Sequence, residues 1–114
     1  MLLFFPQEQF YGNLEYKLYI GLKKNDRILS QFLFRLREGN GKANYIIGIT
    51  DEGFLHITNI KLIMQSIFNF IHIVGKYATY KLRIFTKKPY VFAIISLYRP
   101  NLLQINDIID YNII

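Results

Sequence analysis

Cysteine and tryptophan are absent from the 114-residue chain, and there are only two histidines and three prolines. Without cysteine the chain can form no disulfide, no Cys-ligated zinc site and no thiol nucleophile, which suits a reducing compartment. His56 and His72 fall on different predicted elements and have no acidic cluster at metal-ligand spacing. Asp51 and Glu52 are adjacent in a predicted turn, where Asp serves turn geometry. We therefore expect no metal, no cofactor, no small-molecule substrate and no enzymatic activity.

Long hydrophobic runs are also absent, although 52% of the residues are apolar. The longest charge-free stretch near the middle of the chain, residues 62–75, is interrupted by four polar residues and falls short of a membrane span. The first ten residues lack the basic segment and the long apolar run of a signal peptide. We expect a soluble cytoplasmic protein without a membrane segment. It should fold as a single domain over residues 1–114, with its core at about 12–100.

Acidic residues are scarce, since eight Asp and Glu stand against 14 Lys and Arg, for a formal charge of +6. All 14 basic residues and six of the acidic ones lie in residues 1–100, so this part carries +8. Residues 101–114, with Asp107 and Asp110, carry −2. A compact basic body favours a polyanionic partner, most simply RNA. The alternative, an ordinary domain with a basic surface, remains open on charge alone.

Hydrophobic periodicity predicts two helices and five strands. The first expected elements are a strand at 14–22 and a helix that is capped by Asn25 or Asp26 and stopped by Gly39. Strands at 43–50 and 54–57 follow, joined by a tight turn at 51–53. A second helix, capped by Thr58 or Asn59 and ended by Gly75, precedes strands at 77–85 and 89–98. The order β-α-β-β-α-β-β predicts an α+β two-layer sandwich, with two helices on a mostly antiparallel sheet. This is close to the split βαβ arrangement of ferredoxin-like domains. Residues 101–114 are predicted to form a short helix or an extended tail that docks on the core or inserts into a partner.

The sequence Glu-Gly-Asn-Gly-Lys-Ala at 38–43 raises the question of a phosphate-binding loop. Such a loop needs Gly five residues before the Gly-Lys pair and Ser or Thr after that pair. Leu36 and Ala43 occupy these positions, and Asn44 stands where a dinucleotide-binding loop has its third glycine. In addition, the glycines follow a predicted helix and precede a strand, which reverses the required order. The segment is therefore predicted to end a helix and turn the chain.

Two groups of residues are candidate nucleic-acid-binding sites. The first follows the strand at 77–85, where alternation places cations and aromatic rings on one side; it comprises Tyr77, Lys81, Arg83 and Phe85, extended by Lys87 and Lys88. The second surrounds the first helix, which is expected to turn Arg27, Gln31, Arg35 and Glu38 toward solvent; it comprises Lys23, Lys24, Arg27, Arg35, Arg37 and Lys42. Lys and Arg pair with phosphates, while rings pack against bases or riboses. Each group also fits ordinary solvated charges, and the octapeptide of the RNA-recognition motif is absent.

Three separated motifs resemble those of a known family. They are Gly-Asn-Leu-Glu-Tyr-Lys-Leu at 12–18, Arg-Leu-Arg-Glu-Gly-Asn-Gly at 35–41 and Tyr-Ile-Ile-Gly-Ile-Thr-Asp-Glu-Gly at 45–53. In this order and spacing they resemble the N-terminal domain of the GTP-binding protein 1 and 2 family, relatives of the translational GTPases. The likeness extends more weakly to about residue 100. A free-standing version of this domain is similar to a microsporidian ribosome dormancy factor of the tRNA exit site.

This resemblance implies a dormancy, or hibernation, factor that occupies the exit site (E-site) of the ribosome and inhibits translation. Its partners would be rRNA and ribosomal proteins, and we expect a monomer. GTP hydrolysis is not implied, because no GTPase domain with a phosphate loop follows in these 114 residues. Two alternatives stay open. The chain could be a protein-interaction or regulatory domain that partners a separate translational GTPase, or it could be a general RNA-binding protein.

Overall fold

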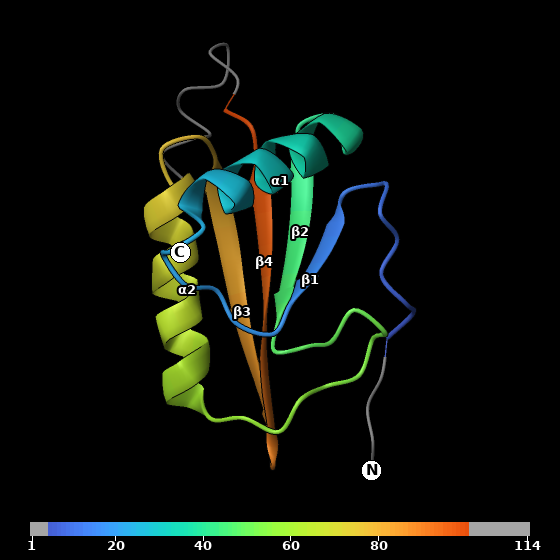
Figure 1. Cartoon of the computed structure of the whole chain (residues 1–114), viewed down its shortest axis with the longest axis vertical. Coiled ribbons are helices and arrows are strands. Elements are labelled where there is room, and N and C mark those ends of the chain that lie inside the picture. The colour runs from blue at the N-terminus through green and yellow to red at the C-terminus, as the bar shows by residue number, and fades with distance from the viewer. Residues whose placement is uncertain (1–4, 101–114) are drawn as a thin grey trace.

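Two helices cover one side of a four-stranded sheet in the computed structural model, which describes residues 5–100 (Figure 1). The elements, in chain order, are β1 (Leu14–Lys17), α1 (Asn25–Glu38), β2 (Lys42–Ile47), α2 (Ile60–Val74), β3 (Thr79–Lys87) and β4 (Tyr90–Tyr98). The predicted α+β class, with two helices on a sheet, is confirmed. The helix or tail predicted at 101–114 lies outside the described residues.

The sheet has the strand order β1-β2-β4-β3 and is mixed. β1 and β2 run parallel, whereas β4 is antiparallel to both β2 and β3, so two of the three pairings are antiparallel. Because β1 and β2 are direct neighbours, no strand separates the two strands of the β1-α1-β2 unit. The split arrangement suggested by the element order is therefore not formed.

The strand predicted at 54–57 is also wrong. These residues make only isolated bridges, one between Leu55 and Ile49 and one between Ile57 and Tyr90. Because its two bridges go to different parts of the chain, the four-residue segment forms no continuous ladder with either one. Its strand-like pattern arises because Leu55 is buried while its immediate neighbours are exposed. The observed order is consequently β-α-β-α-β-β.

The end of α1 was predicted correctly and its start was not. The residue before the helix is Lys24, and no side chain caps the first turn, so the predicted caps Asn25 and Asp26 are wrong. Gly39 follows the last helical residue, as predicted. A Cβ at Gly39 would lie 1.8 Å from the carbonyl oxygen of Lys42, so only glycine fits where the chain folds back. The residues that α1 buries are Ile28, Phe32, Arg35 and Leu36.

Both predicted ends of α2 are confirmed. The side chain of Asn59 accepts a hydrogen bond from the backbone N–H of Leu62 at 3.0 Å, and Gly75 follows the last residue. Along the helix, apolar residues recur at helical spacing and turn inward. The buried members of this stripe are Ile63, Ile67, Phe70, Ile73 and Val74.

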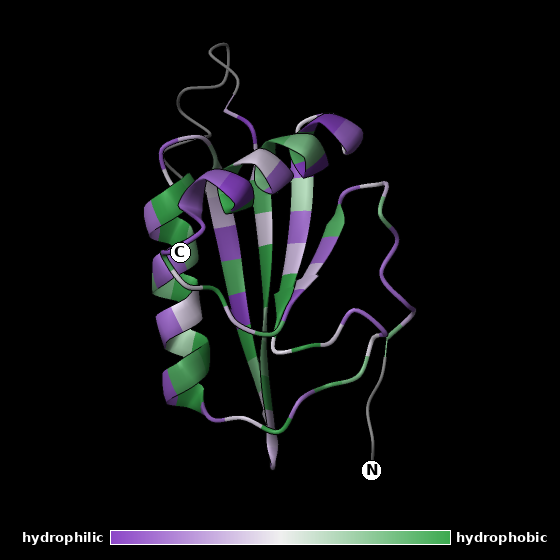
Figure 2. Cartoon of the chain, viewed as in Figure 1, coloured by the Kyte–Doolittle hydropathy of each residue, from purple (hydrophilic) through white to green (hydrophobic). Residues whose placement is uncertain are grey.

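The main core lies between the helices and one side of the sheet, here called the helix face. Apolar and polar residues alternate along β3 (Figure 2), as expected when one face of a strand is buried. The residues that β2 and β4 contribute to this core are Ala43, Tyr45, Ile47, Ala93, Ile95 and Leu97. The Tyr45 ring packs 4.3 Å from the Phe70 ring, centroid to centroid. Its hydroxyl is buried and has no hydrogen-bond partner among the described residues.

The other side of the sheet, here called the open face, carries no helix. Part of it is covered by residues 5–8 and by the loop at 48–58, and a second, smaller core forms there from Tyr16, Ile46, Ile49, Leu55 and Phe92. The Tyr16 hydroxyl donates to the Pro6 carbonyl oxygen at 2.7 Å, which holds the N-terminal segment in place. Gly53 has a φ of 98°, and a Cβ there would lie 2.0 Å from the Phe5 carbonyl oxygen. Glycine is thus required where the two covering segments meet.

Candidate nucleic-acid interface

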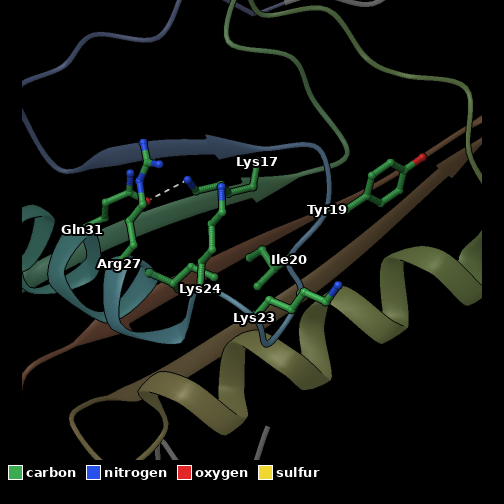
Figure 3. Close-up of a pocket in the computed structure, with 9 residues that line it drawn as sticks. Lys17, Tyr19, Ile20, Lys23, Lys24, Arg27 and Gln31 are labelled. Atoms are coloured by element: carbon green, nitrogen blue, oxygen red, sulfur yellow. Dashed lines mark hydrogen bonds between the residues drawn. The ribbon is translucent and has the colours of Figure 1, made fainter.

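A groove with four cationic side chains opens beside the start of α1 (Figure 3). Its volume is about 350 Å³. This cationic groove is lined by Lys17, Tyr19, Ile20, Gly21, Lys23, Lys24, Arg27, Ile28 and Gln31. Its lining includes no carboxylate, so positive charge is concentrated at one concave surface. Such a surface attracts polyanions.

The segment at 18–24, which joins β1 to α1, is fixed to α2. The backbone N–H of Ile20 donates to Ser66 Oγ at 3.0 Å, and Asn69 Nδ2 donates to the Ile20 carbonyl oxygen at 2.7 Å. The Ile20 side chain is also buried in the main core. Because one residue is held at three points, the backbone that carries Lys23 and Lys24 is in place before any ligand arrives.

Lys17 is a groove residue that sequence reasoning missed. It comes from β1, and its Nζ donates to Gln31 Oε1 of α1 at 2.8 Å, the contact drawn in Figure 3. The same Nζ lies 3.5 Å from Glu15 Oε2. The sequence places Lys17 in the strand predicted at 14–22, but no local signal shows that α1 lies beside it. The groove is therefore a product of the tertiary fold.

Three members of the predicted second group, Lys23, Lys24 and Arg27, do line the cationic groove. All three are exposed. Within residues 5–100 none of them takes part in an ion pair. Their charges are therefore not compensated by a neighbouring carboxylate, and a phosphate can pair with them without displacing one.

Arg35 does not belong to this surface, and the expectation that α1 turns it toward solvent is wrong. Its side chain is only 4% exposed, and its Nε donates to Glu15 Oε1 at 2.9 Å. Its terminal nitrogens donate to the backbone carbonyl oxygens of Gln9, Tyr11 and Gly12 at 2.8–2.9 Å. Arg35 ties the N-terminal segment to α1, and its burial leaves no surface for a phosphate.

The second basic surface lies on the open face. Lys81, Arg83 and Phe85 of β3 share one side of the strand, as the alternation predicts. Lys42 of β2 joins them, because it pairs in register with Tyr98 of β4, which faces the same way. The Lys42 Nζ lies 5.5 Å from the centre of the Tyr98 ring. The open-facing positions of the four strands hold Lys42, Lys81, Arg83 and Lys87, and none holds a carboxylate.

The remaining predicted residues lie apart from these two surfaces. Tyr77 precedes β3 and packs near Lys76, whose Nζ is 5.5 Å from the ring centre. Lys88 lies in the turn between β3 and β4, and Arg37 lies over the Phe34 ring near the end of α1. The structure thus gathers most of the predicted residues into two surfaces and leaves four outside them, namely Arg35, Arg37, Tyr77 and Lys88.

The two basic surfaces occupy opposite edges of the sheet. The cationic groove adjoins β1, and the stripe of cations runs along β3, which are the outer strands. With neighbouring strands about 4.8 Å apart, the backbones of β1 and β3 are separated by about 14 Å. The surfaces also face different sides of the sheet, so they do not merge into one patch.

Three groups with a raised pKa lie outside both basic surfaces, namely Glu8, Tyr16 and Tyr45, and burial is the largest cause for each. Burial raises the pKa of Glu8 from 4.5 to about 7, against the lowering effect of a hydrogen bond donated by the backbone N–H of Tyr16. The nearby charges of Glu15 and Asp51 raise it further. Burial also raises the pKa of the Tyr45 hydroxyl. Because Glu8 belongs to the N-terminal cover and Tyr45 to the core, both bear on stability.

The other chemical candidates of the sequence form no site in the described residues. The segment at 38–43 ends α1 and turns through Asn40 and Gly41, with φ of 55° and 96°, as predicted. His56 and His72 are exposed and lie on separate segments. Residues 5–100 include no group of three His, Asp or Glu side chains that could hold a metal. Within the same residues, no helix combines the length and the apolarity needed to cross a bilayer.

The fold and its two basic surfaces describe a small α+β domain suited to polyanions. No protein-family model, curated protein or solved structure matches the chain.

Proposed function

We propose that this protein is a non-enzymatic ribosome dormancy factor that acts in the cytoplasm. In this proposal it occupies the tRNA exit site, contacts rRNA and ribosomal proteins, and inhibits translation. Its cations hold rRNA phosphates, and its bulk excludes deacylated tRNA. The observation that carries the RNA contact is the cationic groove, where four cations line a concave surface without a carboxylate.

The choice of the exit site rests on the three motifs at 12–18, 35–41 and 45–53. These segments belong to β1, the end of α1, and β2 with the loop that follows it. They therefore build the β1-α1-β2 unit, whose β1 and α1 also supply the cationic groove. Of the residues that line the groove, Lys17 lies within these motifs, so the likeness concerns the β1-α1-β2 unit and the groove is a separate argument from charge.

Co-sedimentation with purified ribosomes over a series of salt concentrations tests the proposal. We expect binding at low salt that weakens steeply as salt rises, because each phosphate contact releases counterions. Competition with deacylated tRNA should reduce binding. No binding at low salt would exclude a ribosomal role. Equal binding to an unrelated structured RNA would favour the general RNA-binding alternative.

A second candidate function, as a partner domain of a translational GTPase, is favoured by an apolar cavity. The cavity has a volume of about 430 Å³ and lies between the segment leading into α2 and the β3–β4 turn. Its lining is mostly apolar and includes Ile57, Ile60, Pro89, Tyr90 and Val91. Ile57 is 64% exposed. A protein partner held here would bind with little dependence on salt, and Ile57→Asp would weaken that binding while leaving ribosome binding intact.

A further inference from the structure

Phe85 stands at the outer edge of the open face as the last ring of a stack. Its ring lies parallel to that of Phe92, with centroids 4.8 Å apart and an interplanar angle of 14°. Phe92 in turn packs edge-on against Phe5 of the N-terminal segment, at 5.8 Å. Phe92 is 8% exposed, whereas Phe85 is 37% exposed. The stack thus begins in the smaller core and ends at solvent.

The outer side of Phe85 has no neighbouring strand. β3 is an edge strand, and in residues 5–100 no further strand pairs beyond it. The ring is nevertheless fixed, since β3 is paired with β4 along its whole length and Phe92 supports the inner face of the ring. A planar ligand that stacked on the outer face would meet a surface already in position, so little conformational entropy would be lost.

Cations flank this ring on the same face of the strand. Arg83 and Lys87 lie two residues before and after Phe85, so each is about 7 Å away along the strand. Both are exposed, and neither takes part in an ion pair within the described residues. Charged side chains are by themselves enough to keep an edge strand from pairing with another sheet. They do not explain why a large apolar ring is exposed between them.

We propose that Phe85 is a stacking site for an unpaired RNA base, and that Arg83 and Lys87 pair with the phosphates on either side of that base. This proposal rests on the RNA-binding function above and specifies the RNA as single-stranded at this surface. Bases inside a duplex are already stacked on one another, whereas unpaired bases stack on aromatic side chains with little dependence on sequence. The open face, which lacks carboxylates at its strand positions, suits the charge of the flanking phosphates.

Binding of a short oligouridylate, compared with a short RNA duplex, tests the proposal. Phe85→Leu keeps an apolar side chain at the edge and removes the planar ring. We expect it to weaken oligouridylate binding by roughly fivefold or more, the loss of one stacked base, with duplex binding unchanged. Phe68→Leu is the matched control, since Phe68 is 63% exposed on α2, away from the open face, and should change neither affinity.

Because the chain has no tryptophan, Phe85→Trp places a single fluorescent reporter at the site. The indole should preserve oligouridylate binding, and its emission should be quenched by a stacked base. Phe68→Trp should show no quenching. Unchanged oligouridylate affinity in Phe85→Leu, an equal loss for the duplex, or no quenching in Phe85→Trp would overturn the proposal.

Ribosome co-sedimentation of the same variants separates this inference from the proposed function. If wild-type protein ignored ribosomes but Phe85→Leu still lost oligouridylate selectively, the dormancy role would be wrong and the stacking site would stand. If wild-type protein bound ribosomes and Phe85→Leu bound oligouridylate as the wild type does, the stacking site would be wrong and the dormancy role would stand.

Discussion

Arg35 and Glu15 form a buried ion pair in which Nε lies 2.9 Å from Oε1, joining α1 to β1. The same guanidinium holds three backbone carbonyl groups of the N-terminal segment. A buried charge is tolerated only when it is paired and hydrogen-bonded. This pair therefore holds α1, β1 and the N-terminal segment together.

Arg35→Ala should lower the free energy of unfolding by about 3–5 kcal/mol, because Glu15 would keep only the more distant Lys17, at 3.5 Å, and three backbone carbonyl groups would lose their donor. Urea denaturation followed by circular dichroism measures the change. Arg37→Ala, at an exposed position of the same helix, is the control and should change stability by less than about 0.5 kcal/mol. Equal costs for the two variants would contradict the assigned role of Arg35.

Removing the hydroxyl of Tyr45 and removing that of Tyr16 should change the free energy of unfolding in opposite directions. Tyr45→Phe removes a buried hydroxyl that has no partner among the described residues, so it should raise the free energy of unfolding by about 1 kcal/mol. Tyr16→Phe removes the donor to the Pro6 carbonyl oxygen and should lower it by about the same amount. The pair is matched, since each variant deletes one oxygen from a buried ring. A shift of the same sign in both, measured by urea denaturation, would argue against this account.

Glu8 should make stability depend on pH near neutrality. Its folded-state pKa of about 7 exceeds the ordinary value of 4.5, so the folded protein binds more protons than the unfolded chain between these values. The contribution is fully present below about pH 4.5 and is lost as pH rises through about 7. Stability should therefore fall over this range. Glu8→Gln, whose side-chain oxygen can still accept the Tyr16 N–H, should flatten the dependence.

Urea denaturation at several pH values between about 5 and 8 measures this effect. The control is Glu52→Gln, which changes an exposed acid in the turn at 51–53. This variant should keep the wild-type slope. A slope in Glu8→Gln equal to that of the wild type would show that another group is responsible.

Neutralising the cationic groove should reduce both ribosome affinity and its salt dependence. The double variant Lys23→Gln/Lys24→Gln removes two phosphate contacts, so the slope of log K against log salt should decrease in magnitude by about 1.4–1.8. Lys61→Gln/Lys76→Gln makes the same charge change outside both basic surfaces and should affect the slope far less. Ribosome co-sedimentation measures both variants, and circular dichroism checks that they remain folded. Equal slopes in the two double variants would remove the groove from the interface.

Short-range sequence patterns predicted correctly those element ends and strand faces that depend on neighbouring residues. The ends of α2, the Gly39 stop of α1 and the sidedness of β3 follow from caps, glycine and period-two alternation. The segment at 54–57 was misread because His56 alternates with Leu55 and Ile57 in the sequence, whereas in the structure Leu55 is buried and Ile57 is exposed. The start of α1 was misread because Asn25 and Asp26 are good capping residues, yet the helix includes both.

Partners distant in sequence could not be deduced from the chain. Arg35 resembled its exposed neighbours, and only the fold places Glu15 and the N-terminal carbonyl groups around it. Likewise, Lys42 was grouped with the first helix, but its pairing with Tyr98 assigns it to the open face. The surroundings of Arg35 and of Lys42 both depend on which strands are neighbours in the sheet, and no single segment of the sequence encodes that order.

Because the two basic surfaces lie on opposite edges of the sheet, they can hold two separate stretches of RNA, which would raise the avidity of binding. If each holds its own stretch of RNA, the second contact forms within an existing complex and at a high effective concentration. The domain would then act as a bivalent clamp, bridging two rRNA segments about as far apart as its sheet is wide. Dissociation would require both contacts to open together, so weak individual contacts would still give a long residence time.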